Sequence, residues 1–125
     1  MHGKLSGALC TSCHATWEAP LEMGRDTPCP DCHALTARPD IVWFGEIPHH
    51  LDAIADHLAS ADLFVSIGTS GQVYPAAAFV EDANARNIPT LEMSLEPTAI
   101  SSQFDEVRLG PATQVVPQWV AEILS

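Results

Sequence analysis

Four cysteines in two Cys-x-x-Cys pairs constrain this chain more than any other feature. The pairs are Cys10–Cys13 and Cys29–Cys32, with 15 residues between them, and the chain has no other cysteine. Each pair can place two thiolates on one side of a tight turn, and two such turns complete a tetrahedron around Zn²⁺. Because four thiolates leave no position open for water, we expect this zinc to be structural rather than catalytic.

Two other uses of the cysteines compete with zinc, namely two disulfides or a thioredoxin-like redox pair. The spacing falls within or next to the zinc-ribbon range, and a reducing compartment disfavours disulfides, so zinc is the preferred interpretation. His14 and His33 each follow a pair directly and could replace a cysteine as ligand. Adjacent residues seldom both reach one metal, so we interpret the two histidines as solvated neighbours.

The composition narrows the classes of partner. The formal net charge is −11 with only five Lys and Arg, so the surface repels phosphate backbones and nucleic acid is a poor partner. The same charge is compatible with lysine-rich peptides. No apolar run approaches the ~20 residues that span a bilayer, and the first residues lack the apolar segment of a signal peptide. We therefore expect a cytoplasmic protein with no membrane partner.

Beyond the cysteine-rich segment, the pattern is that of an α/β fold. A buried strand, a helix and a second strand form a βαβ unit, preceded and followed by amphipathic helices. Residues 41–44 form a short apolar run. We predict a helix over 51–58, strands over 62–67 and 90–93, a helix from Pro75 toward Asn87, and a closing helix over 115–124. The fold class is a partial Rossmann-like, doubly wound parallel sheet with an inserted four-Cys zinc-ribbon module. Two strands make only half of such a sheet, so the sequence is expected to begin partway through a fold.

Five short motifs occur in order along the whole chain and resemble those of sirtuins, which are NAD-dependent protein-lysine deacylases. They are Met1-His2-Gly3, the segment Arg38 to Glu46, Gly68-Thr69-Ser70 with the following Val73 to Ala76, Leu95-Glu96-Pro97, and Gly110-Pro111-Ala112. Each motif alone is weak, but five in order around a four-Cys site are specific. The chain is most similar to the bacterial branch grouped with broad-range deacylases.

The resemblance implies an activity and a role for each motif. Sirtuins transfer the acyl group of acyl-lysine to the ADP-ribose of NAD and release nicotinamide. His2 matches the catalytic histidine, which acts as general base on a ribose hydroxyl. The implied substrate-binding residues are Val42, Phe44, Gly45 and Glu46 on one wall, with Val73 and Tyr74 on the other. The implied NAD-binding residues are Gly68, Thr69, Ser70, Ser94, Leu95, Glu96 and Ala112.

The resemblance also implies two domains: residues 1–38 as the zinc-binding module with the preceding His2 stretch, and residues 39–125 as the carboxy-terminal part of the NAD-binding domain. The substrate peptide is expected to bind by strand addition, and the unpaired sheet edge leaves self-association open. Taken singly, each motif has a simpler explanation. Gly68-Thr69-Ser70 fits any strand-to-helix turn, Phe44 fits a core aromatic, and Glu46 fits a solvated charge.

The chain departs from the family in two respects. Ser94 stands where the family commonly has Asn, which offers the adenosine ribose a longer reach. The family's Gly-Ala-Gly phosphate loop and Gln-Asn-x-Asp stretch do not occur in these 125 residues. We therefore expect no deacylase activity from this chain alone, and a poorly ordered His2 at the free terminus. The alternative function is a non-catalytic zinc-binding remnant that acts as an interaction module, with a zinc-ribbon nucleic-acid binder as a distant third.

Overall fold

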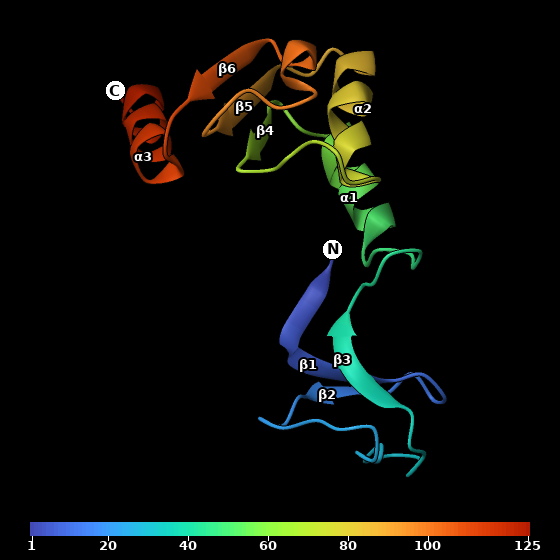
Figure 1. Ribbon diagram of the computed structural model, residues 1–125. Coiled ribbons are helices and arrows are strands. Elements are labelled where there is room, and N and C mark those ends of the chain that lie inside the picture. Colours follow the sequence, from blue (N-terminus) through green and yellow to red (C-terminus); the bar gives the residue numbers. More distant parts are fainter. The chain divides into compact units, whose positions relative to one another are not determined.

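The structure is a computed structural model that describes residues 1–125. It divides the chain into two units, which we call unit 1 (Met1–Asp52) and unit 2 (Ala53–Ser125). Each unit has its own sheet (Figure 1). No helix of the structure is long and apolar enough to cross a membrane.

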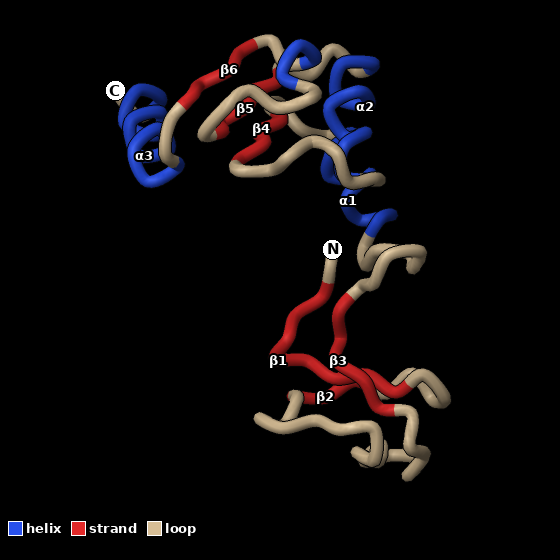
Figure 2. The backbone as a smooth tube through the Cα atoms, viewed as in Figure 1, coloured by secondary structure: helices blue, strands red, loops and turns tan.

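Unit 1 is built on a three-stranded antiparallel sheet in the order β2-β1-β3. The strands are β1 (Gly3–Cys10), β2 (Thr16–Glu18) and β3 (Ala37–Ile41). Figure 2 shows that the chain between β2 and β3 is loop throughout. Among its hydrophobic residues only Ala8, Cys10 and Cys29 are buried. Unit 1 therefore has almost no apolar core of its own.

The amino terminus of unit 1 is held by backbone hydrogen bonds. The N–H of Val42 donates to the carbonyl of His2 at 3.0 Å, and the N–H of His49 donates to that of Met1 at 2.9 Å. Gly3 permits this pairing, because its φ is +76° and a Cβ there would lie 1.9 Å from the Asp40 carbonyl oxygen. The expectation of a poorly ordered His2 was wrong, since a β1–β3 ladder continues almost to the first residue.

Unit 2 holds a three-stranded parallel sheet in the order β4-β5-β6. The strands are β4 (Phe64–Ile67), β5 (Thr90–Ser94) and β6 (Glu106–Leu109). All five residues of the central strand β5 are buried, whereas the two outer strands are partly exposed. The other elements are α1 (Leu51–Ala59), two 3-10 turns, η1 (Ala76–Ala78) and η2 (Ser101–Gln103), α2 (Phe79–Ala85) and α3 (Ala112–Ile123).

The core of unit 2 joins helices α1 and α2 to the sheet. Leu58 of α1 and Ala83 of α2 pack with Ile88, and Phe64 of β4 and Phe79 lie against this cluster. Leu58 belongs to the apolar face that the sequence predicts for 51–58, and it is the one buried residue of α1. Burial of this face against a parallel strand is the arrangement that a βαβ unit requires.

The predicted α/β class is confirmed, with three differences in detail. The apolar run over 41–44 lies mostly outside the sheet, because strand β3 ends at Ile41 and residues 43–46 form a turn. The helix that begins near Pro75 opens as the 3-10 turn η1 before α2. Strand β6 was missed, because Val107 and Leu109 alternate with charged residues and form no continuous apolar run.

Candidate functional site

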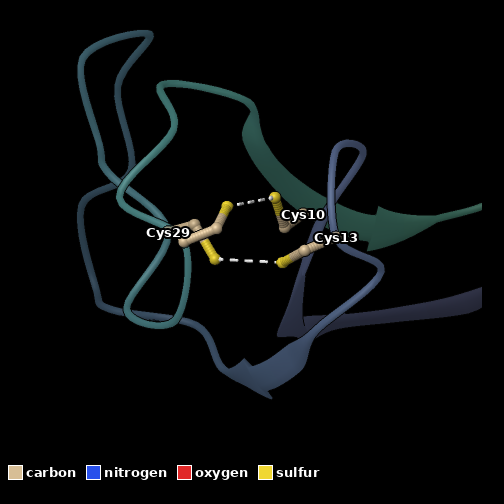
Figure 3. Close-up of side chains that lie close together, drawn as sticks. Cys10, Cys13 and Cys29 are labelled. Atoms are coloured by element: carbon tan, nitrogen blue, oxygen red, sulfur yellow. Dashed lines mark hydrogen bonds between the residues drawn. The ribbon is translucent and has the colours of Figure 1, made fainter.

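The four cysteines form one cluster in unit 1. Cys10 ends β1 and Cys13 lies in the turn after it, while Cys29 and Cys32 lie in a turn before β3. All four sulfur atoms lie within 4.8 Å of one another, and Cys10–Cys32 and Cys13–Cys29 Sγ atoms are both 3.6 Å apart (Figure 3). A tetrahedron with Zn–S bonds of ~2.3 Å has sulfur atoms ~3.8 Å apart. The spacing therefore fits zinc, and it is far longer than the ~2.05 Å of a disulfide.

The two cysteine turns have the same backbone. The N–H of His14 donates to the carbonyl of Cys10 and the N–H of His33 donates to that of Cys29, both at 3.0 Å. Both histidines have a φ of +61°. The group of donors close enough to share a metal contains the four cysteines alone. His14 and His33 thus shape the turns through their backbones, while both side chains are exposed.

The surroundings of the cluster favour a thiolate at Cys10. The hydroxyl of Thr36 lies 3.2 Å from the Cys10 sulfur, and with backbone N–H groups of the turn it lowers the pKa of Cys10 to about 6. The backbone near Ala15 acts in the same direction on Cys13, but burial and the neighbouring thiols raise the pKa of Cys13 to about 12. Four crowded thiols resist losing all their protons unless a cation sits among them, and a coordinated divalent cation removes those protons outright.

A second group of predicted site residues also lies in unit 1. His2 is exposed, and its backbone pairs with that of Val42, which starts the predicted substrate segment. The N–H of Glu46 donates to the carbonyl of Trp43 at 3.0 Å and closes a turn over residues 43–46. Gly45 has a φ of +88°, as the third residue of a type II turn requires. Within unit 1, His2 therefore lies beside Val42, the first of the predicted substrate-binding residues.

The turn over 43–46 is held by a residue that the sequence analysis did not assign to the site. Arg38 donates from both terminal nitrogens to both carboxylate oxygens of Glu46, and its guanidinium lies 3.9 Å from the centre of the Trp43 ring. Arg38, followed by the N–H of Trp43, lowers the pKa of Glu46 to about 2. The sequence offers one signal for this pair: Arg38 and Glu46 carry opposite charges and lie eight residues apart, on either side of a strand end.

The predicted nucleotide residues lie at one edge of the sheet of unit 2. Gly68, Thr69 and Ser70 follow β4, Ser94 to Glu96 follow β5, and Ala112 follows β6. Because the three strands are parallel, all of these loops leave the sheet at its carboxyl edge. Two backbone bonds of 2.9 Å tie the edge together, from the Gly68 N–H to the Met93 carbonyl and from the Gly110 N–H to the Ser94 carbonyl.

Ser94, the residue at which the chain departs from the resemblance, is buried, and its hydroxyl donates to the carbonyl of Glu96 at 2.8 Å. The loop that follows is fastened to Glu92, which is 1% exposed and accepts hydrogen bonds from the hydroxyls of Thr98 and Ser101. Glu92 is a second residue that sequence reasoning missed. The available signal was a charged residue within a predicted parallel strand.

The predicted substrate-binding residues are divided between the two units. Val73 and Tyr74 lie in unit 2 with exposed side chains, whereas His2 and residues 42–46 lie in unit 1. A groove between these two segments stays a prediction.

Comparison with known proteins gives consistent matches over the chain. The family model described as "Sir2 family" matches residues 1–75. An NAD-dependent protein deacylase of Caulobacter vibrioides is 53% identical over 126 residues, which cover 100% of this chain and 53% of the relative. An NAD-dependent protein deacylase of Bdellovibrio bacteriovorus is 48% identical, over 99% of this chain and 52% of the relative. The chain therefore spans about half the length of the curated relatives that it matches.

Solved structures give the same result. A Sir2 homologue in complex with NAD has a TM-score of 0.86 and 30% identity, and the match covers 98% of this chain and 49% of that one. A Sir2 protein bound to a myristoylated histone peptide has a TM-score of 0.76 and 27% identity, over 98% and 55% of the two chains.

Proposed function

Because this chain belongs to the Sir2 family, we propose that it forms about half of an NAD-dependent protein-lysine deacylase of the sirtuin type. The observation that carries the proposal is the convergence of residues 68–70, 94–96 and 112 on the carboxyl edge of one parallel sheet. Doubly wound sheets bind ligands at this edge. A similar Sir2 homologue was solved as a complex with NAD, which supports NAD as the co-substrate.

In the proposed reaction, the residues of this chain bind and orient NAD and move one proton. NAD supplies, when bound, an ADP-ribose that accepts the acyl group and a nicotinamide that leaves. The glycine of Gly68-Thr69-Ser70 allows close approach of the backbone, and the two hydroxyls can donate to ribose or phosphate oxygens. The imidazole of His2 serves as general base for a ribose hydroxyl.

The proposed substrate is an acyl-lysine protein or peptide. Val42 and Phe44 to Glu46 would line one side of the acyl-lysine, with Val73 and Tyr74 on the other. A formal charge of −11 suits lysine-rich segments, and a similar Sir2 protein was solved with a myristoylated histone peptide. Absence of nucleic-acid and membrane partners, self-association and a cytoplasmic location stay predictions.

The four cysteines would hold a structural Zn²⁺, since four thiolates occupy every position of a tetrahedral site. The metal would fix one end of β1 and of β3, and His2 and Val42 directly adjoin the other ends of these two strands. The division into domains 1–38 and 39–125 also stays part of the proposal.

The test is NAD-dependent release of nicotinamide with an acetyl-lysine peptide, measured for this chain alone and after it is combined with a separately made amino-terminal half. We expect no turnover from the chain alone, because only part of the NAD contacts are present and positioning supplies much of the rate. Turnover should appear in the assembled protein, should be lost in His2→Ala, and should persist in the control His57→Ala, which changes an exposed histidine of α1.

Two results would change the proposal. Turnover by the isolated chain that His2→Ala abolishes would remove the need for a second half. An assembled protein that binds zinc but neither binds NAD nor releases nicotinamide would favour the interaction module instead.

A further inference from the structure

The turn over residues 43–46 is organised around the side chain of Arg38. One guanidinium binds both carboxylate oxygens of Glu46, donates to the carbonyl of Ile41, and stacks on the ring of Trp43. Glu46 in turn accepts the N–H of Trp43 at 2.9 Å. The first and last residues of the turn, and the strand end before it, are therefore all fastened to the same group.

The contacts of Arg38 depend on the planar fork of the guanidinium. A lysine carries a single point of charge and cannot bind both carboxylate oxygens and stack on an indole together. The Arg38 side chain is only 17% exposed, and its Nε is buried without a hydrogen-bond partner. A buried donor with no acceptor costs stability. The cost of this unpaired Nε is set against contacts that fix the shape of the turn and that only an arginine can make together.

The result of this arrangement is the position of Phe44. Phe44 lies at the corner of the turn and is 100% exposed, although residues 43 and 46 on either side of it are fixed. Ile47, directly after the turn, is 82% exposed. The backbone that carries this ring is already fixed, so binding a ligand has to order only the side chain of Phe44.

We propose that Arg38 is a positioning residue for substrate, which holds Phe44 in place for the acyl-lysine side chain. This inference rests on the proposed deacylase function. Arg38 itself contacts no substrate and acts through Trp43 and Glu46. Because a contact between Phe44 and the lysine alkyl chain is equally present in the bound substrate and in the transition state, its loss raises KM for the peptide and leaves kcat nearly unchanged.

The experiment measures kcat and the two KM values in the assembled protein for Arg38→Ala, Arg38→Lys and Glu46→Gln. The matched control is Arg25→Ala, which removes an exposed arginine of unit 1 that forms no ion pair. For Arg38→Ala we expect an increase of about tenfold in KM for the acyl peptide, with KM for NAD and kcat within about threefold. For Arg38→Lys we expect a peptide KM between those of wild type and Arg38→Ala, since lysine keeps the charge but not the planar guanidinium.

A second measurement follows the turn directly, as the fluorine NMR signal of fluorinated phenylalanine at position 44. Arg38→Ala should broaden or move this signal, and Arg25→Ala should leave it unchanged. The inference is overturned if Arg38→Ala and Arg25→Ala give the same peptide KM, or if kcat and both KM values change together with the melting temperature. If the assembled wild-type protein releases no nicotinamide, the proposed function fails, and this inference falls with it.

Discussion

Unit 1 and unit 2 bury different kinds of side chain. In unit 1 the buried hydrophobic residues are one alanine and two cysteines, and the cross-links are polar: the sulfur cluster and the Arg38–Glu46 pair. In unit 2 a parallel strand is buried along its whole length, and aliphatic and aromatic side chains pack on it. In a module of about 50 residues, burial of apolar surface alone gives only marginal stability. The comparison therefore predicts that the two units respond differently to the same kinds of change.

The largest effect is expected from Cys29→Ala, which removes one of the four thiolates. Structural zinc contributes on the order of 10 kcal/mol of binding energy in small modules, and unit 1 has no core to compensate for the loss. We expect one Zn²⁺ per wild-type chain by elemental analysis, and loss of amide protection over residues 8–38 in the variant by hydrogen exchange.

The control for this prediction is unit 2, whose helices α2 and α3 should keep most of their protection in Cys29→Ala. A wild-type chain without zinc, or a disulfide mapped between any two of the cysteines, would contradict the zinc site. Equal loss of protection in both units would contradict the separation between them.

The corresponding change in unit 2 is Glu92→Ala. It leaves the hydroxyls of Thr98 and Ser101 without their acceptor and opens space inside β5, so we expect a loss of about 2–4 kcal/mol in the free energy of unfolding. Denaturant unfolding followed by circular dichroism measures it, with the exposed Glu81→Ala as control. Zinc content should stay at one per chain, and a drop in zinc would show that the units depend on each other.

A smaller difference is expected in acid. Arg38 holds the pKa of Glu46 at about 2, below its unfolded value of about 4.3, so the pair contributes its full stability above pH ~4.3 and loses it as the pH falls toward 2. The stability difference between wild type and Arg38→Ala should shrink over this range. Acid-induced loss of zinc is common to both proteins and cancels in the comparison.

The carboxyl carbon of Glu46, followed by NMR, should titrate near 2 in wild type and at a higher pH in Arg38→Ala. Arg108→Ala in unit 2 is the control, because it removes the partner of Glu122 and should leave the titration of Glu46 unchanged. The same Glu46 curve in all three proteins would exclude the Arg38–Glu46 pair.

The smallest effect is expected from His14→Gly. The residue has a φ of +61°, where glycine avoids the cost of a Cβ, so we expect a gain of about 0.5 kcal/mol after the entropy of the unfolded glycine is included. His57→Gly, inside helix α1, should have the opposite sign by a few tenths of a kcal/mol. Thermal unfolding measures both, and a loss of stability in His14→Gly would show that the imidazole makes a contact of its own.

Much of unit 2 could be predicted from the sequence, because its elements are long enough to show their periodicity. The apolar face that contains Leu58 and the two strands β4 and β5 on either side of helix α2 were found in this way. Strand β6 was not, since an edge strand with alternating charged residues resembles a loop. The carboxyl-edge position of residues 68–70 and 94–96 then follows from parallel pairing.

In unit 1, only the metal site could be predicted, because the spacing of the cysteines determines which residues can share a metal ion. Two Cys-x-x-Cys pairs predict a shared site, and the four sulfur atoms do come together. The two-bond ion pair between Arg38 and Glu46 could not be predicted, because it depends on where β3 ends. The apolar run over 41–44 does not mark that end. The backbone pairing of His2 with Val42 could not be predicted either, because the two residues lie 40 positions apart in the sequence.

The identical backbone of the two cysteine turns has a consequence for the order of assembly. Each turn is closed by bonds within six residues, from Cys10 to Ala15 and from Cys29 to Ala34, so either can form before the other. The first ion to arrive can be captured by either pair, after which the remaining step is the closure of the loop between Cys13 and Cys29. For 15 residues the entropy of that closure is about 2 kcal/mol, far less than four metal–sulfur bonds return. Capture of the ion should therefore precede, and then drive, the pairing of β1 with β3.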